Sequence, residues 1–166
     1  MTQAGMRIRL PISTLLLLLF IAIVSVSCGK KPVYNEFRMI PAEGWQVDSR
    51  CDFEVDMNDT TQLFNLYVDV RHSGNYPYQN LWLFVERMSP DSTVVKDTIA
   101  CDLADYKGKW LGVGSGSIYL LTVPYLQQKV EIQGKYIFKI VHGMRDEVLH
   151  GVHAIGLRIE SEDGEK

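Results

Sequence analysis

The sequence lacks a large excess of charge of either sign. Its 17 Lys and Arg residues nearly balance 20 Asp and Glu residues, which gives a formal net charge of −3. Nucleic-acid-binding domains usually carry a strong basic surplus, so this composition argues against a nucleic-acid partner. The chain also lacks low-complexity tracts and internal repeats with a period of about 20–50 residues, which excludes solenoid architectures.

Recognisable catalytic motifs are missing as well. There is no Gly-x-Ser-x-Gly or His-Glu-x-x-His sequence, and the glycine-rich segment 108–116 leads into a strand-like run rather than a helix. A phosphate-binding loop would open a helix. His150 and His153 are three residues apart, so on a strand they point to opposite faces and cannot share a metal ion. We therefore expect no catalytic residues, no metal site, no cofactor and no enzymatic activity.

Cysteine is scarce, with three in the chain. Cys28 follows the apolar segment described next, which leaves Cys51 and Cys101 as a pair. Cys51 opens one strand-like run and Cys101 closes another, so both could lie at one end of a sheet and form a disulfide. The alternative is two buried free thiols, because unpaired cysteine is among the most buried residue types.

The most distinctive stretch is the N-terminal one. Arg7 and Arg9 precede an apolar run at residues 15–24, and small residues follow up to Cys28. A basic start, a short apolar core and a small-residue cleavage site are typical of a secretory signal peptide, and a cysteine at this position is typical of a bacterial lipoprotein. We predict a signal peptide at 1–27, a lipidated Cys28 with a tether at 28–41, and a folded domain at 42–166. The alternative is a soluble exported protein with a free Cys28.

Period-two alternation dominates the rest of the chain. In residues 51–57 and 64–71, apolar side chains alternate with polar ones, which is typical of half-buried strands. About eight such segments at near-even spacing predict an all-β fold, a single antiparallel sandwich of the jelly-roll or immunoglobulin-like kind. Residues 81–85 are apolar at every position, so we expect that strand to be covered on both faces or flanked by a loop. The strand at 118–123 should stop at Pro124, and brief helical turns are expected near 103–106 and 125–128.

Three aromatic residues are candidates for partner contacts. Tyr76 and Tyr78 flank Pro77 in a predicted loop, and Trp110 lies in the glycine-rich segment. Tyrosine and tryptophan are enriched at protein interfaces, so these side chains could bind another protein. Packing against the sandwich is the alternative for each ring. If the rings were exposed, coplanar and beside a polar groove, the domain could instead bind a glycan or another ligand.

Short segments in a fixed order across the mature chain carry a family resemblance. They are Val33-Tyr34-Asn35, Trp45, Tyr76-Pro77-Tyr78, Asp97-Thr98-Ile99, Leu103-Ala104-Asp105, Gly108-Lys109-Trp110-Leu111-Gly112, Met144-Arg145 and Ile155-Gly156-Leu157-Arg158-Ile159-Glu160. In this arrangement the chain resembles the GldH-type gliding-motility lipoproteins of the Bacteroidetes.

The resemblance implies an outer-membrane-associated lipoprotein of the envelope machinery for gliding and type IX secretion. It implies no catalytic residue and no cofactor, and its partners would be the membrane and other envelope proteins. Lipoproteins of this phylum that reach the cell surface usually carry acidic residues after the cysteine. Gly29-Lys30-Lys31 is basic here, so we expect the protein to face the periplasm.

Overall fold

The strands form where apolar and polar residues alternate. In β3 (Cys51–Met57) the four odd-numbered side chains are buried and the three acidic residues between them are exposed. The structure, a computed structural model, describes residues 32–162. The other strands are β1 (Tyr34–Met39), β2 (Trp45–Gln46), β4 (Leu63–Ser73), β5 (Asn80–Met88), β6 (Val94–Asp102), β7 (Val113–Ser115), β8 (Ile118–Lys129), β9 (Gly134–His142), β10 (Val148–Leu149) and β11 (Val152–Glu162).

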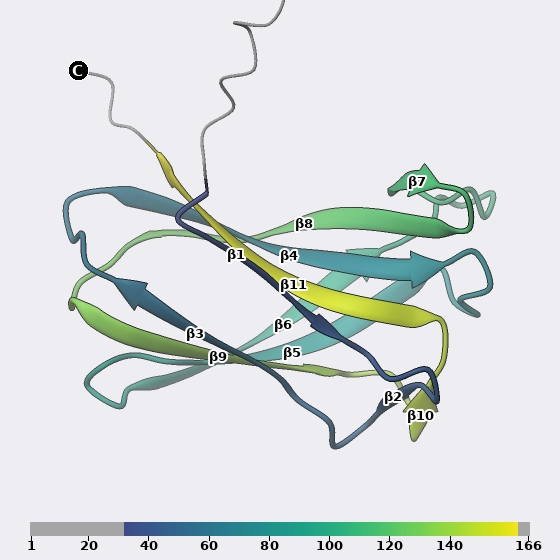
Figure 1. The fold of residues 1–166 in the computed structure, drawn as a ribbon, viewed down its shortest axis with the longest axis horizontal. Coiled ribbons are helices and arrows are strands. Elements are labelled where there is room, and N and C mark those ends of the chain that lie inside the picture. The colour runs from purple at the N-terminus through teal and green to yellow at the C-terminus, as the bar shows by residue number, and fades with distance from the viewer. Residues whose placement is uncertain (1–31, 163–166) are drawn as a thin grey trace, which may run out of the picture. The chain divides into compact units, whose positions relative to one another are not determined.

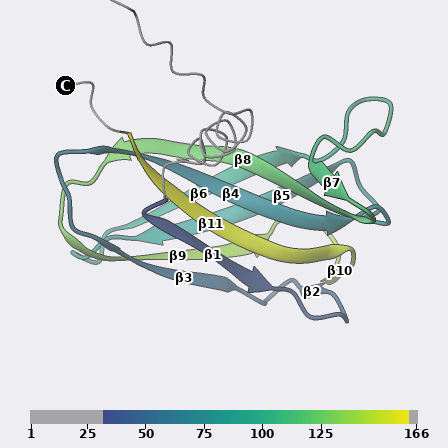
Figure 2. The ribbon, with the colours of Figure 1, turned by 45° about the horizontal axis from the view of Figure 1, so that its top comes forward.

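Two antiparallel sheets form the layers of a sandwich (Figures 1 and 2). The five-stranded sheet has the order β1-β11-β4-β8-β7, and the four-stranded sheet has the order β3-β9-β5-β6. A third pair, β10-β2, lies beside them at one end. The predicted all-β antiparallel sandwich is confirmed. The described residues form eleven strands rather than about eight, because β2, β7 and β10 are too short to leave an alternating pattern.

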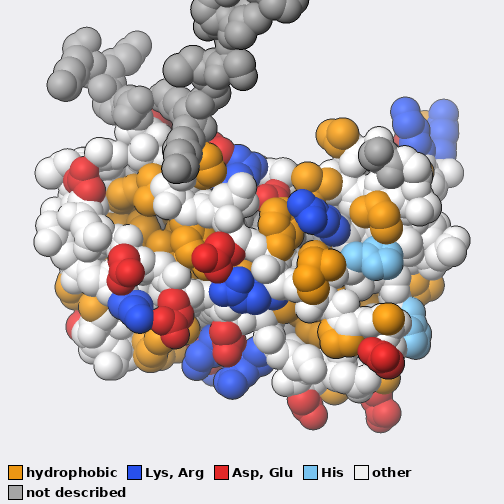
Figure 3. Space-filling model, viewed as in Figure 1, with side chains coloured by type: hydrophobic (Ala, Val, Ile, Leu, Met, Phe, Trp, Pro, Cys, Tyr) orange, Lys and Arg blue, Asp and Glu red, His pale blue; other side chains and the backbone are white. Residues whose placement is uncertain are grey.

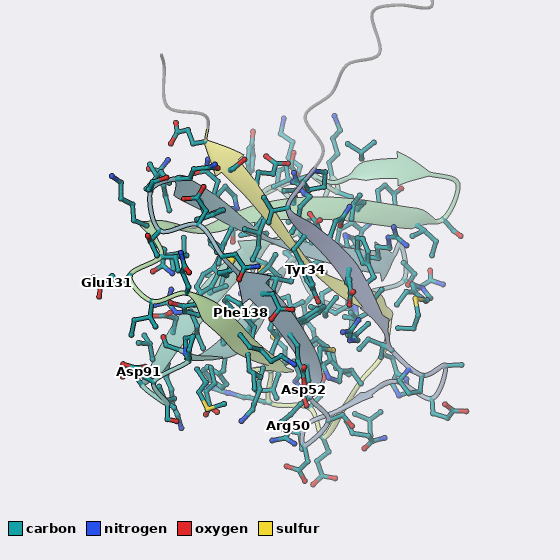
Figure 4. All side chains as sticks on the ribbon, turned by 60° about the vertical axis from the view of Figure 1, so that its left-hand side comes forward. Tyr34, Arg50, Asp52, Asp91, Glu131 and Phe138 are labelled. Atoms are coloured by element: carbon teal, nitrogen blue, oxygen red, sulfur yellow. The ribbon has the colours of Figure 1, made fainter. Side chains whose placement is uncertain are left out.

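The inward faces of the two sheets make one apolar core. Phe53 and Phe138 occupy opposite positions on β3 and β9, and both are almost fully buried. In Figure 4, Phe138 lies near the centre of the side chains, whereas Arg50 lies at their margin. Residues Leu66, Val68 and Val70 of β4 and Leu157 and Ile159 of β11 supply the other half of the core.

The sandwich has two distinct ends. At one end, Leu63 of β4 pairs with Lys129 of β8 and with Glu162 of β11. The chain joins the five-stranded sheet nearer to that end, where the Val33 N–H donates a hydrogen bond of 2.8 Å to the Ile159 carbonyl. The opposite end carries the pair β2 and β10 and the loop at 74–79 between β4 and β5, and we call it the β2–β10 end.

Two sequence-based boundaries were wrong. The sheet begins at Tyr34, inside the predicted tether at 28–41, because Tyr34–Met39 pairs along its whole length with β11. The strand that was expected to stop at Pro124 continues as β8 to Lys129. A register shift at Leu66/Tyr67 places Pro124 opposite Tyr67 and lets pairing resume at Leu126, so 125–128 is strand and not helix.

The other helical candidate also forms no helix. Residues 103–106 belong to a loop in which Ala104 makes an isolated antiparallel bridge with Trp110. No helix among residues 32–162 has the length and apolar character needed to cross a membrane. The predicted signal peptide and Cys28 lie outside the described residues.

Candidate functional site

Three aromatic rings gather around His72 at the β2–β10 end. The ring centroid of His72 lies 4.6 Å from that of Trp110, 5.6 Å from that of Tyr119 and 5.9 Å from that of Tyr76. Tyr78 extends this group outward, with its centroid 5.9 Å from that of Tyr76. The three predicted contact residues Tyr76, Tyr78 and Trp110 are therefore brought to one place in the fold.

Only one of these three side chains is exposed. Tyr76 is buried, and its hydroxyl donates a hydrogen bond of 3.0 Å to the Asn80 carbonyl, so it holds the loop in place. Gly151 permits this packing, because a Cβ there would lie 2.9 Å from the Tyr76 Cα. Trp110 is half-buried against His72. Tyr78 is exposed, and its hydroxyl donates to both carboxylate oxygens of Asp146, at 2.9 and 3.1 Å.

These rings do not make a flat platform. The planes of Tyr76 and Tyr78 meet at 73°, and those of Trp110 and Tyr119 meet at 42°. A sugar ring stacks on an exposed flat aromatic surface, so this cluster does not meet the condition set for glycan binding. Its role is to pack the end of the sandwich, with Tyr78 at its outer edge.

An exposed apolar surface of the four-stranded sheet lies beside Tyr78 and was missed in the sequence. Trp82 and Phe84 of β5 point away from the core, with 42% and 49% of their side chains exposed, while Leu81, Leu83 and Val85 point inward. The apolar run at 81–85 was expected to be covered on both faces or flanked by a loop. It is covered on one face only.

We call the exposed side chains Tyr78, Trp82 and Phe84, together with the half-buried Met144, the Trp82 patch. Together with Asn80, Gly143 and Arg145 they line a hollow of about 450 Å³. Gly143 lets the Phe84 ring pack against the backbone, because a Cβ at that position would lie 2.9 Å from two ring carbons of Phe84. Phe84 also forms the wall of a second hollow of about 300 Å³, which Arg50 and Lys139 line on the other side.

Charged side chains on the described surface are mixed in sign. Lys and Arg side chains intermingle with Asp and Glu side chains on the face shown in Figure 3. On the outer face of the four-stranded sheet, Glu86 pairs with Lys139 at 3.0 Å and with Lys96 at 3.4 Å. Residues 32–162 hold no group of three or more His, Cys, Asp or Glu side chains that could bind a metal ion.

Cys51 and Cys101 are free, buried thiols. They lie on β3 and β6, the two edge strands of the four-stranded sheet, with β9 and β5 between them. Three strand spacings amount to about 14 Å, whereas a disulfide needs Cα atoms within about 7 Å. The predicted disulfide is therefore wrong and the alternative holds. Burial raises the pKa of each thiol to about 12, which keeps both protonated.

Two buried histidines make stability depend on pH. His72 Nδ1 lies 3.0 Å from the Ser73 carbonyl and His142 Nε2 lies 3.1 Å from the Trp45 carbonyl, so each neutral ring donates its one proton there. Burial lowers the pKa of both imidazoles. As the pH falls, these histidines are therefore protonated in the unfolded chain before they are in the folded chain. Proton uptake then favours the unfolded state, so the free energy of unfolding decreases as the pH falls below about 6.5.

We expect the free energy of unfolding to fall between pH 7 and pH 5, by at most about 1.4 kcal/mol per histidine for each pH unit. Urea titrations at each pH measure it. The His72→Gln and His142→Gln changes together should weaken the dependence of the free energy of unfolding on pH. His150→Gln, at an exposed position, should leave that dependence unchanged. An identical slope in the double variant would contradict the assignment to these two rings.

Comparison with known proteins places the chain in a family. The GldH lipoprotein family profile matches residues 32–159, which is almost the whole described sandwich. The chain belongs to the GldH lipoprotein family. It is 34% identical over 153 residues to a gliding motility lipoprotein GldH homolog of Christiangramia forsetii, covering 87% of this chain and 93% of that one. It is 32% identical over 154 residues to gliding motility lipoprotein GldH of Flavobacterium johnsoniae, covering 89% and 96%.

A solved 4-O-methyl-α-glucuronidase also overlaps the GldH-type sandwich, with 13% identity and a TM-score of 0.42, over 82% of this chain and 18% of the enzyme. Those values are too low to indicate a shared function. In this GldH family member, the Trp82 patch on the outer face of the four-stranded sheet is a candidate binding surface.

Proposed function

We propose that the protein is a lipid-anchored envelope component that acts by protein contacts, in the machinery for gliding motility or type IX secretion. The observation that carries this proposal is the Trp82 patch. In it, Trp82 and Phe84 are exposed on β5, an inner strand of the four-stranded sheet. Exposed aromatic clusters of this kind are typical of binding surfaces. Membership of a family of lipoproteins, two relatives of which are named for gliding motility, supports the cellular setting.

The position of Cys28 supports anchoring close to the membrane. The first backbone contact of the sandwich is made by Val33, five residues after Cys28. Five extended residues span at most about 18 Å. An acylated Cys28 therefore holds the sandwich near the lipid surface, in an outer membrane facing the periplasm, as the basic residues Lys30 and Lys31 favour.

Two observations support a partner contact at the patch. The chain joins the five-stranded sheet, whereas Trp82 and Phe84 lie on the outer face of the four-stranded sheet. Trp82 also lies toward the β2–β10 end, since its carbonyl accepts the Gly143 N–H at 2.7 Å. The function needs no catalytic residue, and the absence of enzymatic activity remains a prediction.

Deletion of the protein from its native cells tests this function. We expect less type IX cargo in the medium, and less colony spreading where the cells glide, with both restored by the wild-type chain. Trp82→Ala together with Phe84→Ala should fail to restore them at an unchanged amount of protein, because both side chains are exposed and their loss leaves the core intact. Normal secretion and spreading after deletion would contradict the proposal.

A further inference from the structure

The Trp82 patch has an unusual charge environment. Arg50 and Arg145 are the exposed arginines among residues 32–162, and neither makes an ion pair, a hydrogen bond or a ring contact with another described residue. Arg145 lines the hollow on one side of Phe84, and Arg50 lines the hollow on the other side. Both free guanidinium groups therefore border the same aromatic surface.

Carboxylates near the patch are already engaged. Glu86 is shared between Lys139 and Lys96, and Asp146 accepts the hydrogen bond from the Tyr78 hydroxyl. No acidic side chain of the described surface pairs with Arg50 or Arg145, so their positive charge is available to a ligand. A guanidinium group binds a carboxylate through two parallel hydrogen bonds, which gives the contact both strength and direction.

We propose that the Trp82 patch binds an acidic segment of another envelope polypeptide, whose apolar side chains cover Trp82 and Phe84 and whose carboxylates pair with Arg50 and Arg145. The inference rests on the proposed function and names the chemistry of its partner. Trp, Tyr, Met and Arg are the residue types enriched at the centres of protein interfaces. Met144 adds an adaptable apolar side chain to the rim of the hollow.

A polypeptide fits this surface better than a glycan or a lipid headgroup does. Asn80 is the one amide side chain that lines the hollow of about 450 Å³. The hollow therefore offers few polar side chains that could hydrogen-bond to sugar hydroxyls. The patch lies on the four-stranded sheet, whereas Val33 makes its backbone contact with the five-stranded sheet. Charge complementarity and the apolar surface between the two arginines match an acidic chain with apolar side chains.

Site-specific photo-cross-linking in native cells tests the inference. The full lipidated chain carries the photoreactive residue p-benzoylphenylalanine at position 84, and the control carries it at position 113, which is 82% exposed on β7 of the other sheet. We expect a polypeptide adduct from position 84 alone, with the cross-linked segment rich in Asp and Glu by mass spectrometry. An adduct with lipid or glycan, a segment without acidic residues, or no adduct would overturn the inference.

Charge reversal makes the test specific to the two arginines. Arg50→Glu and Arg145→Glu should each lower the adduct yield about tenfold, the effect expected when a charge-assisted hydrogen bond is lost. Lys129→Glu, an exposed residue on β8, changes the net charge equally and should leave the yield within about twofold, because exposed charges this far apart are screened. Unchanged yields in both arginine variants would overturn the acidic-segment proposal alone. Normal secretion after deletion would count against the proposed function itself.

Discussion

Replacing Phe138 by alanine should lower the free energy of unfolding by about 3–5 kcal/mol, the range measured when buried aromatic side chains are truncated. Phe138 lies on β9 with 1% of its surface exposed, directly opposite Phe53 of β3. Both sheets pack around this position, so the cavity cannot collapse without moving strands. Urea titration followed by far-ultraviolet circular dichroism measures the change as a shift of the midpoint.

Phe84→Ala is the matched control for that change. Phe84 belongs to the same sheet but points outward, and 49% of its surface is exposed. We expect a cost below about 1 kcal/mol, since substitutions on an exposed surface usually change stability little. Equal costs for Phe84→Ala and Phe138→Ala would contradict the division of this sheet into a core face and a binding face.

The strands whose two faces differ could be predicted from the sequence. Residues 51–57 were predicted as a strand with its acidic side chains outward, and β3 has those bounds and that orientation. Alternation identifies such a strand because successive side chains point to opposite faces. One set is buried and the other is exposed to water. β1 could not be found this way, because its half-buried residues Tyr34, Phe37 and Arg38 do not alternate with exposed ones and its pairing depends on distant β11.

The same reasoning missed the exposed aromatic face of β5. Residues 81–85 are apolar at every position, and an apolar residue is expected to be buried, so the pattern predicted a strand covered on both faces or flanked by a loop. The structure leaves Trp82 and Phe84 in solvent. Natural sequences depart from local rules chiefly at functional sites, and this departure is the reason to regard the Trp82 patch as functional.

Long-range separations could not be predicted at all. The sequence allowed Cys51 and Cys101 either to pair at one end of a sheet or to be buried free thiols. They lie in one sheet, but at opposite edges of it. Strand order is set by packing between segments far apart in the chain, which periodicity does not report. Tyr76, Tyr78 and Trp110 were predicted as candidate partner contacts; the structure brings them together, but Tyr76 is buried and fixes the loop.

Replacing Cys28 by alanine should release the protein from the membrane completely. A single acyl chain binds a bilayer only marginally, at about 0.8 kcal/mol per buried methylene, but the two or three chains of a bacterial lipoprotein anchor it in effect permanently. Without the thiol no chain can be attached, and the sandwich carries mixed surface charge that offers weak attraction to lipid. Cys51→Ala removes a thiol that is buried in the core and should leave anchoring unchanged.

The central claim, that a lipid anchor at Cys28 holds this sandwich at the envelope, is tested most directly by fractionation of native cells. The amounts of wild type, Cys28→Ala and Cys51→Ala are compared in salt-washed membranes and in the soluble fraction. We predict that wild type and Cys51→Ala remain with the membranes and that Cys28→Ala is found in the soluble fraction at its normal size. Retention of Cys28→Ala on the membranes at the wild-type level would contradict the claim.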